Sequence, residues 1–273
     1  MSEFETIVSN IISDTPPGEI RDVYDSLITI AGEQAKETIL AVIEQYNVEN
    51  NIPVTVDSKD VVLSKHGKTA GSKFYDPIES VAFSVDHLTR QAFNIEPYRD
   101  FTPIGEDLKA IIPKLESYTE TNYPGDVTFG VYPVVEDGSN SYINEYEIII
   151  VSTKYNPGNF WGGHWKSRYI YDVRGQQLVG EIAVNVHYYE DGNVTFKSSK
   201  DVSLSDVSVA NIVNAIAGVE EEFEKNLDRS FEELNEKQFK SLRRRLPVTR
   251  AKVNWGRPMG NYRLGRDAAQ GSR

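Results

Sequence analysis

Residues 178–194 read LVGEIAVNVHYYEDGNV, the stretch that most clearly decides the fold. Apolar and polar side chains alternate, as in a strand that packs on one face and is more polar on the other. The first face carries Ile182, Val184, Val186 and Tyr188, and the second carries Asn185, His187 and Tyr189. Because an Asp-Gly turn follows directly, the stretch predicts one arm of a β-hairpin.

The same chemistry extends over 127–202. Segments rich in β-branched and aromatic residues are separated by turn sequences at 136–139, 156–159, 173–176 and 190–193. Consecutive strands joined by short turns pair with their neighbours along the chain. This region therefore predicts an antiparallel β-meander.

Helical spacing dominates the two ends of the chain. In the first 50 residues, three apolar stripes are separated by Pro16-Pro17-Gly18 and a second short break, which predicts three helices packed as a small bundle. A long helix is expected from Asn211 to about Leu246, where Pro247 ends it. Its apolar stripe consists of Ile212, Ile216, Val219, Phe223, Leu227, Phe231 and Leu234.

The region between the bundle and the meander is mixed. Val54 and Val56 alternate with polar residues, as do the apolar residues of 81–85, which predicts strands of a partly solvated antiparallel sheet. Residues 107–118 show helical spacing, although Pro113 is expected to kink or end that helix.

These patterns predict an α+β fold: a helical stalk, an antiparallel meander, and a long helix lying across the sheet before a flexible basic arm. We divide the chain into a stalk, a mixed α/β globule, a sheet, an amphipathic helix and an arm, at 1–50, 51–126, 127–210, 211–246 and 247–273.

Charge is distributed unevenly along the 273 residues, whose net charge is −12. From Lys240 to the C-terminus there are ten basic side chains and one acidic one, a net of +9, so the preceding residues carry −21. The whole-chain value argues against general affinity for nucleic acid or anionic lipid. The basic arm, in contrast, suits an acidic partner.

Several classes of protein are excluded or disfavoured. The chain has no cysteine, which rules out disulfide scaffolds and thiol chemistry. It has neither the pattern of a signal peptide nor an apolar run of roughly 20 residues, the length needed to cross a membrane. A cytoplasmic protein is the expectation.

No catalytic constellation is recognisable. The segment 66–69, HGKT, imitates the end of a phosphate-binding loop, but Val62 stands where that motif requires glycine, so a polar hairpin loop is favoured. Glu190 and Asp191 are best interpreted as turn residues. The four histidines lack metal-ligand spacing, and His187 is expected to bond a neighbouring polar group. We therefore expect no enzyme activity, metal or cofactor.

Two tryptophans, Trp161 and Trp165, flank a glycine pair within 159–166, NFWGGHWK. A ligand platform is one interpretation. The favoured one is that the indoles pack the sheet against a helix or a partner, while the glycines allow a bulge or a close backbone approach.

The basic arm also carries large apolar groups, which a solvated tail seldom does. Basic and aromatic residues together suit single-stranded nucleic acid or an acidic protein surface with a hydrophobic pocket. A nucleic-acid-binding protein is therefore kept as the alternative.

Two segments, VHYYEDGNV at 186–194 and FKSLRRRLPVTRAKVNW at 239–255, closely resemble the signatures of the α subunit of F-actin capping protein. Further motifs of that family occur in its order: PPGE at 16–19, FYDP at 74–77, DHL at 86–88, YP at 123–124 and NFW at 159–161. The resemblance covers nearly the whole chain.

The resemblance implies an obligate heterodimer with a β subunit of similar fold, the two sheets joining into one. That heterodimer binds the barbed end of an actin filament and blocks subunit addition and loss, without nucleotide hydrolysis or calcium. It belongs to the cytoplasm and actin-rich cortical structures, and its family attracts phosphoinositides and capping-inhibitor peptides as regulators.

By position in the matched motif, Lys240, Arg244 and Arg250 correspond to the family's basic actin-contacting residues. The full set of expected actin-binding residues is Lys240, Arg243, Arg244, Arg250, Lys252, Trp255, Met259, Tyr262 and Leu264. In one respect the chain departs from the family, whose C-terminal tentacle is an amphipathic helix: glycines and Pro258 interrupt the region after Trp255. We expect this arm to become ordered only on actin, or to contribute less.

Overall fold

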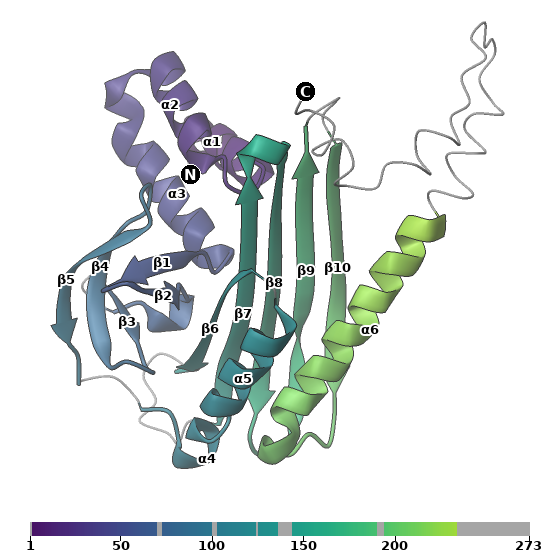
Figure 1. Cartoon of the computed structure of the whole chain (residues 1–273). Coiled ribbons are helices and arrows are strands. Elements are labelled where there is room, and N and C mark those ends of the chain that lie inside the picture. The colour runs from purple at the N-terminus through teal and green to yellow at the C-terminus, as the bar shows by residue number, and fades with distance from the viewer. Residues whose placement is uncertain are drawn as a thin grey trace, which may run out of the picture. The chain divides into compact units, whose positions relative to one another are not determined.

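A computed structural model of the chain describes residues 2–69, 73–99, 103–123, 125–135, 144–189 and 194–233. The chain divides into two compact units, Met1–Phe223 and Glu224–Arg273, and each is considered by itself. The first unit contains both sheets, five of the six α-helices of the described chain and the first half of the sixth (Figure 1).

The N-terminal bundle consists of α1 (Glu3–Asp14), α2 (Ile20–Ala31) and α3 (Lys36–Glu49). The 3₁₀ helix η1 (Glu33–Ala35) lies between α2 and α3 and leads directly into α3. Ser2 caps α1 and exchanges hydrogen bonds with Glu5 in a capping box. The buried core of the bundle is formed by Val8, Ile12, Leu27, Ala35, Ile39, Val42 and Ile43. The predicted three helices are confirmed.

A five-stranded sheet of order β2-β1-β5-β4-β3 follows the bundle. Its strands are β1 (Pro53–Val56), β2 (Lys59–Val62), β3 (Phe74–Asp76), β4 (Val81–Asp86) and β5 (Gln91–Pro97). Three of the four pairings are antiparallel, as predicted. The fourth is not: β1 and β5 run parallel, joined through Thr55 and Gln91.

The second sheet has the order β10-β9-β8-β7-β6, and every neighbouring pair is antiparallel. Its strands are β6 (Asp126–Pro133), β7 (Glu145–Asn156), β8 (Trp161–Asp172), β9 (Gln177–Tyr188) and β10 (Val194–Leu204). The predicted meander is confirmed. Of its four predicted turns, 156–159 includes the 3₁₀ helix η3 (Pro157–Asn159) and 173–176 is a turn, whereas 136–139 and 190–193 lie outside the described residues.

The segment predicted as one helix over 107–118 is two helices, α4 (Glu106–Lys109) and α5 (Ile112–Asn122). Pro113 lies in the first turn of α5, where a missing backbone N–H costs nothing, so the proline marks a helix start. The last described helix, α6 (Ile212–Glu233), follows the 3₁₀ turn η4 (Val209–Asn211). The predicted end of this helix near Leu246 lies outside the described residues.

Strand β8 separates two layers of the first unit. Trp165 and Tyr169 contact Phe223 and Glu220 of α6 on one face. Lys166 points to the other face and donates to the Glu49 carbonyl at the end of α3. Because successive side chains of a strand alternate between faces, the sheet has α5 and the start of α6 on one side and the bundle on the other (Figure 1).

The predicted polar face of β9 is therefore a packed surface. His187 is buried, and its Nδ1 lies 3.0 Å from Oε1 of Glu19, at the start of α2. The expectation that this ring bonds a neighbouring polar group is confirmed. Close by, Gly162 approaches the Pro17 carbonyl so tightly that an added Cβ would lie 2.7 Å from that oxygen. The expected close backbone approach at the glycine pair is thus present.

Two glycines offer a matched test of this packing. A Cβ at Gly180 would lie 2.1 Å from the Arg168 carbonyl oxygen, whereas one at Gly218, inside α6, would meet nothing within 4 Å. We expect Gly180→Ala to lower the free energy of unfolding by about 1 to 3 kcal/mol. Gly218→Ala should raise it by up to about 1 kcal/mol, because alanine is the better helix former. Urea unfolding measures both, and equal effects from the two substitutions would contradict this packing.

Candidate functional site

The expected actin-binding residues, Lys240, Arg243, Arg244, Arg250, Lys252, Trp255, Met259, Tyr262 and Leu264, all lie outside the described residues. Their roles remain predictions. What the structure describes is the part of the chain that leads to them, together with the surfaces of the first unit on which another chain can dock.

Helix α6 is fixed to the second sheet by a buried carboxylate. Glu220 is 4% exposed and accepts hydrogen bonds from the phenols of Tyr118 and Tyr123, at 2.6 Å each, and of Tyr169, at 3.1 Å. Burial, reinforced by the negative charge of Glu220, raises the pKa of Tyr123 and Tyr169. Both phenols therefore stay protonated as donors, and three hydrogen bonds offset the cost of burying the acid.

This arrangement corrects the predicted apolar stripe of α6. The buried residues of α6 are Ile212, Val213, Ile216, Glu220 and Phe223. An acid is therefore buried next to the expected Val219, which is itself only half-buried. Helical periodicity alone gives no signal for a buried glutamate.

The tryptophan segment also contributes here. The ring of Trp165 packs edge-on against Phe223, with centroids 5.5 Å apart, and against Tyr123 at 6.3 Å. The expectation that an indole packs the sheet against a helix is confirmed for this residue.

The second sheet has one open edge. Among the described strands, β10 pairs with β9 alone, in unbroken register over eleven residues from Val194 to Leu204. The opposite edge strand, β6, is covered by β2 and α5. A long edge strand without bulge or proline exposes backbone groups to which another strand can pair. Strand β10 is therefore a candidate site for a second chain.

The N-terminal bundle offers a second candidate docking surface, which is apolar. Phe4, Ile7 and Ile11 follow the spacing of one face of α1 and are 38%, 51% and 41% exposed. On α2, Ile30 is 83% exposed. Apolar side chains gathered on one helix face are typical of a surface that another protein covers.

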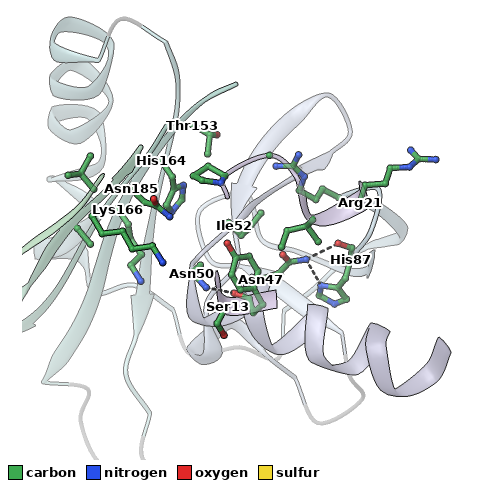
Figure 2. Close-up of a pocket in the computed structure, with 18 of the residues that line it drawn as sticks. Ser13, Arg21, Asn47, Asn50, Ile52, His87, Thr153, His164, Lys166 and Asn185 are labelled. Atoms are coloured by element: carbon green, nitrogen blue, oxygen red, sulfur yellow. Dashed lines mark hydrogen bonds between the residues drawn. The ribbon is translucent and has the colours of Figure 1, made fainter. Parts of the chain in front are cut away.

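A cavity of about 370 Å³ lies between the bundle and the second sheet (Figure 2). His164, Lys166 and Asn185 approach it from β8 and β9, and Asn47 and Asn50 from α3 and the residue after it. The Asn47 amide donates to the His87 carbonyl at 2.8 Å, which holds the turn after β4 against the bundle.

His164 gives the cavity a measurable pH dependence. Burial, together with the charge of Lys166, lowers the pKa of His164 to about 4. The unfolded chain, with an ordinary value near 6.5, binds this proton more readily, so the native state loses stability as the pH falls through that interval. We expect His164→Asn to reduce the decrease in the free energy of unfolding on acidification by up to about 3 kcal/mol. Urea unfolding between pH 7 and 4 measures it, and an unchanged pH slope would contradict it.

The described residues of the other chemical motifs form no assembled site. His66 and Gly67 lie in the 3₁₀ turn η2 (Lys65–Gly67), where the Ser64 hydroxyl accepts from the His66 amide. Lys68 forms an antiparallel bridge with Phe74, so the predicted hairpin loop is present only in the second half of the segment. The described side chains contain no group of three or more acids and histidines that could hold a metal. Within the described ranges, no helix is both long and apolar enough to cross a membrane.

Comparison with known proteins places these features in a family. The family model described as F-actin capping protein alpha subunit matches residues 8–267. The chain is 54% identical to the F-actin-capping protein subunit alpha of Saccharomyces cerevisiae, over 99% of this chain and 98% of that protein. It is also 54% identical to the subunit of the same name from Candida glabrata, over 99% of both.

A solved structure, described as that of the homodimeric actin capping protein alpha subunit from Plasmodium berghei, has the same fold. Its TM-score is 0.67 at 23% identity, covering 91% of this chain and 99% of that one. The sheets and helices thus share the α+β fold of that structure. This chain belongs to the F-actin capping protein alpha subunit family, as its sequence motifs predicted.

Proposed function

We propose that this chain is the α subunit of a heterodimer that binds the barbed end of actin filaments and blocks addition and loss of subunits. The observation that carries the proposal is the 54% identity, over nearly the full length of both chains, to a protein named F-actin-capping protein subunit alpha. Such a function needs binding surfaces and no catalytic chemistry, so we propose a non-enzymatic protein of the cytoplasm and the actin cytoskeleton.

Binding to actin is assigned to the basic segment. Lys240, Arg244 and Arg250 are proposed to meet acidic groups of actin, with Arg243 and Lys252 adding to the local positive charge. The apolar contacts are proposed to come from Trp255, Met259, Tyr262 and Leu264. Long-range attraction then steers the encounter, while the apolar groups slow dissociation.

Pairing with a β subunit is assigned to the open edge of the second sheet. Strand β10 offers backbone groups for a ladder with a strand of the partner, and the exposed face of α1 offers further apolar area. Phosphoinositides and capping-inhibitor peptides remain proposed regulators.

Neighbouring proline substitutions on β10 test this edge. Successive N–H groups of a strand point to opposite edges, so one of Ser198→Pro and Ser199→Pro removes an N–H of the open edge. We expect that variant to retain at most about a tenth of the co-purified partner, because an interface hydrogen bond is lost and the proline ring obstructs pairing. Ser198→Ala and Ser199→Ala keep both N–H groups and should bind normally. Normal recovery of the partner with both proline variants would mean that the subunit interface does not use the edge of β10.

The function itself is tested by co-expressing the chain with a β subunit and following elongation from filament seeds. Barbed-end growth should stop at substoichiometric amounts relative to total actin, while pointed-end growth continues. The same preparation should show no binding to single-stranded RNA at physiological salt. Uninhibited growth together with RNA binding would favour the nucleic-acid alternative.

A further inference from the structure

The cavity between the bundle and the second sheet has an unusual charge. Four basic side chains line it, and each comes from a different part of the fold: Arg21 on α2, Arg90 in the turn before β5, Lys166 on β8 and Lys197 on β10. Among the described residues that line the cavity, none is an Asp or a Glu. The site therefore carries a concentrated positive potential.

This positive charge is largely uncompensated. Lys197 lies 3.6 Å from a carboxylate oxygen of Asp14. Within the part of the chain that the structure describes, Arg21, Arg90 and Lys166 have no carboxylate within salt-bridge distance. Lys166 donates only to a backbone carbonyl, that of Glu49, at 3.3 Å. Cationic groups drawn together without matching acids favour binding of an anion.

The ammonium group of Lys166 is destabilised by its position in the cavity. Burial lowers the pKa of Lys166 and Arg168 lowers it further, against the opposing charges of Glu181, Glu49 and Glu147, none of which lies within salt-bridge distance of this ammonium. A bound anion would reverse that penalty, because an opposite charge nearby favours the charged amine.

Uncharged polar groups on the sheet side also lack partners. His164 and Asn185 stand opposite each other in the ladder of β8 and β9. Oδ1 of Asn185 is shielded from solvent and has no hydrogen-bond partner among the described residues. Both ring nitrogens of His164 are shielded too, and the backbone of Asn50 interacts with this ring without reaching hydrogen-bond distance. Such atoms are rare in native proteins, and a bound ligand or water explains them. They supply a donor and acceptors beside the cations.

We propose that this cavity binds a small soluble phosphate ester. Arg90 and Lys166 would hold the phosphate, since guanidinium and ammonium groups are the usual phosphate ligands in proteins. The His164–Asn185 pair would bond hydroxyl groups of the ester after a small turn of the ring. A volume of about 370 Å³ is within the range of small-molecule sites. Ile52 and Leu88 contribute apolar surface for a carbon chain.

The histidines provide a local readout. The chain contains four, of which His87 and His164 line the cavity and His66 lies outside it. No histidine occurs from Lys240 to the C-terminus, so none of these signals comes from the basic arm itself. Histidine-selective NMR of the full chain, in the assembly in which it is purified, can therefore follow titration with glycerol 3-phosphate at constant pH and ionic strength.

We expect saturable shifts of the His87 and His164 signals, with His66 unchanged. Arg90→Gln and Lys166→Met should each weaken binding about tenfold, the usual loss for one charged hydrogen-bonding group. Lys36→Met removes an exposed cation of α3 outside the cavity and should bind like the unaltered protein. Two cavity variants are used so that one poorly folded protein does not decide the result.

Three outcomes of this titration would overturn the inference. The first is the absence of His87 and His164 shifts at millimolar ester. The second is equal shifts of His66, His87 and His164, and the third is binding unaffected by both cavity substitutions. A parallel titration uses phosphatidylcholine vesicles containing phosphatidic acid. A response to the vesicles without a response to glycerol 3-phosphate would also overturn it, because the ligand would then be a lipid headgroup. None of these results depends on whether the protein caps filaments.

Discussion

Charge reversal at Lys240, Arg244 and Arg250 together is expected to weaken barbed-end capping by at least about a hundredfold. Each substitution to glutamate replaces an attraction to acidic actin by a repulsion, and charge pairs at interfaces are worth about 2 kcal/mol or more. Because salt screens such pairs, the triple variant should also lose most of the salt dependence of capping. Seeded elongation at several ionic strengths measures both quantities.

A matched control changes the same net charge elsewhere. Lys36, Lys65 and Lys109 are exposed in the first unit, and their reversal to glutamate should leave capping within about threefold of normal, the small effect expected of screened charges outside the actin-binding segment. Both triple variants should retain the β subunit. Equal loss in the two variants would mean that total charge matters, and normal capping by the first would move the actin site out of the basic segment.

Glu220→Ala should be among the most destabilising single substitutions in the first unit. It leaves the phenols of Tyr118, Tyr123 and Tyr169 without their acceptor in a buried site. Removal of one member of a buried charged network costs about 3 to 5 kcal/mol, so urea unfolding should shift strongly to lower concentration. Glu220→Gln keeps one acceptor oxygen and should lose less.

The comparison for this experiment is Glu224→Ala, one turn further along α6. That residue is exposed, and its loss should change the free energy of unfolding by less than about 0.5 kcal/mol. If Glu220→Ala were as mild as this control, the three phenols would have to find other acceptors, and the role assigned to the carboxylate would be wrong.

Local patterns predicted the fold where each strand pairs with its neighbour along the chain. Alternation and turn residues from 127 to 202 are sufficient for a meander, since each hairpin specifies the next. The parallel pairing of β1 with β5 carries no such signal, because it brings together Thr55 and Gln91 across several intervening elements. Pro113 was recognised as an obstacle to one helix, but its place in the first turn of a second helix depends on where α4 ends.

The binding features were predictable to different extents. The basic segment is contiguous, so its charge and its family motif are visible in the sequence. The cavity is not, because Arg90, Lys166 and Lys197 lie far apart along the chain and meet only when the bundle docks on the sheet. Glu220 was hidden for a similar reason: its polar side chain contradicts the apolar period, and its donors come from α5, the residue after it and β8.

The Glu220 site also has a consequence for the order of events during synthesis. Its three donors precede it by 102, 97 and 51 residues. The segments that form the bundle and both sheets are therefore synthesised before Glu220 emerges from the ribosome. Until then, these phenols lack the carboxylate that accepts their hydrogen bonds. Contacts of such large sequence separation form late in folding. Until α6 is synthesised, the face of the sheet on which it packs is uncovered, so incomplete chains are expected to aggregate more readily than the full chain.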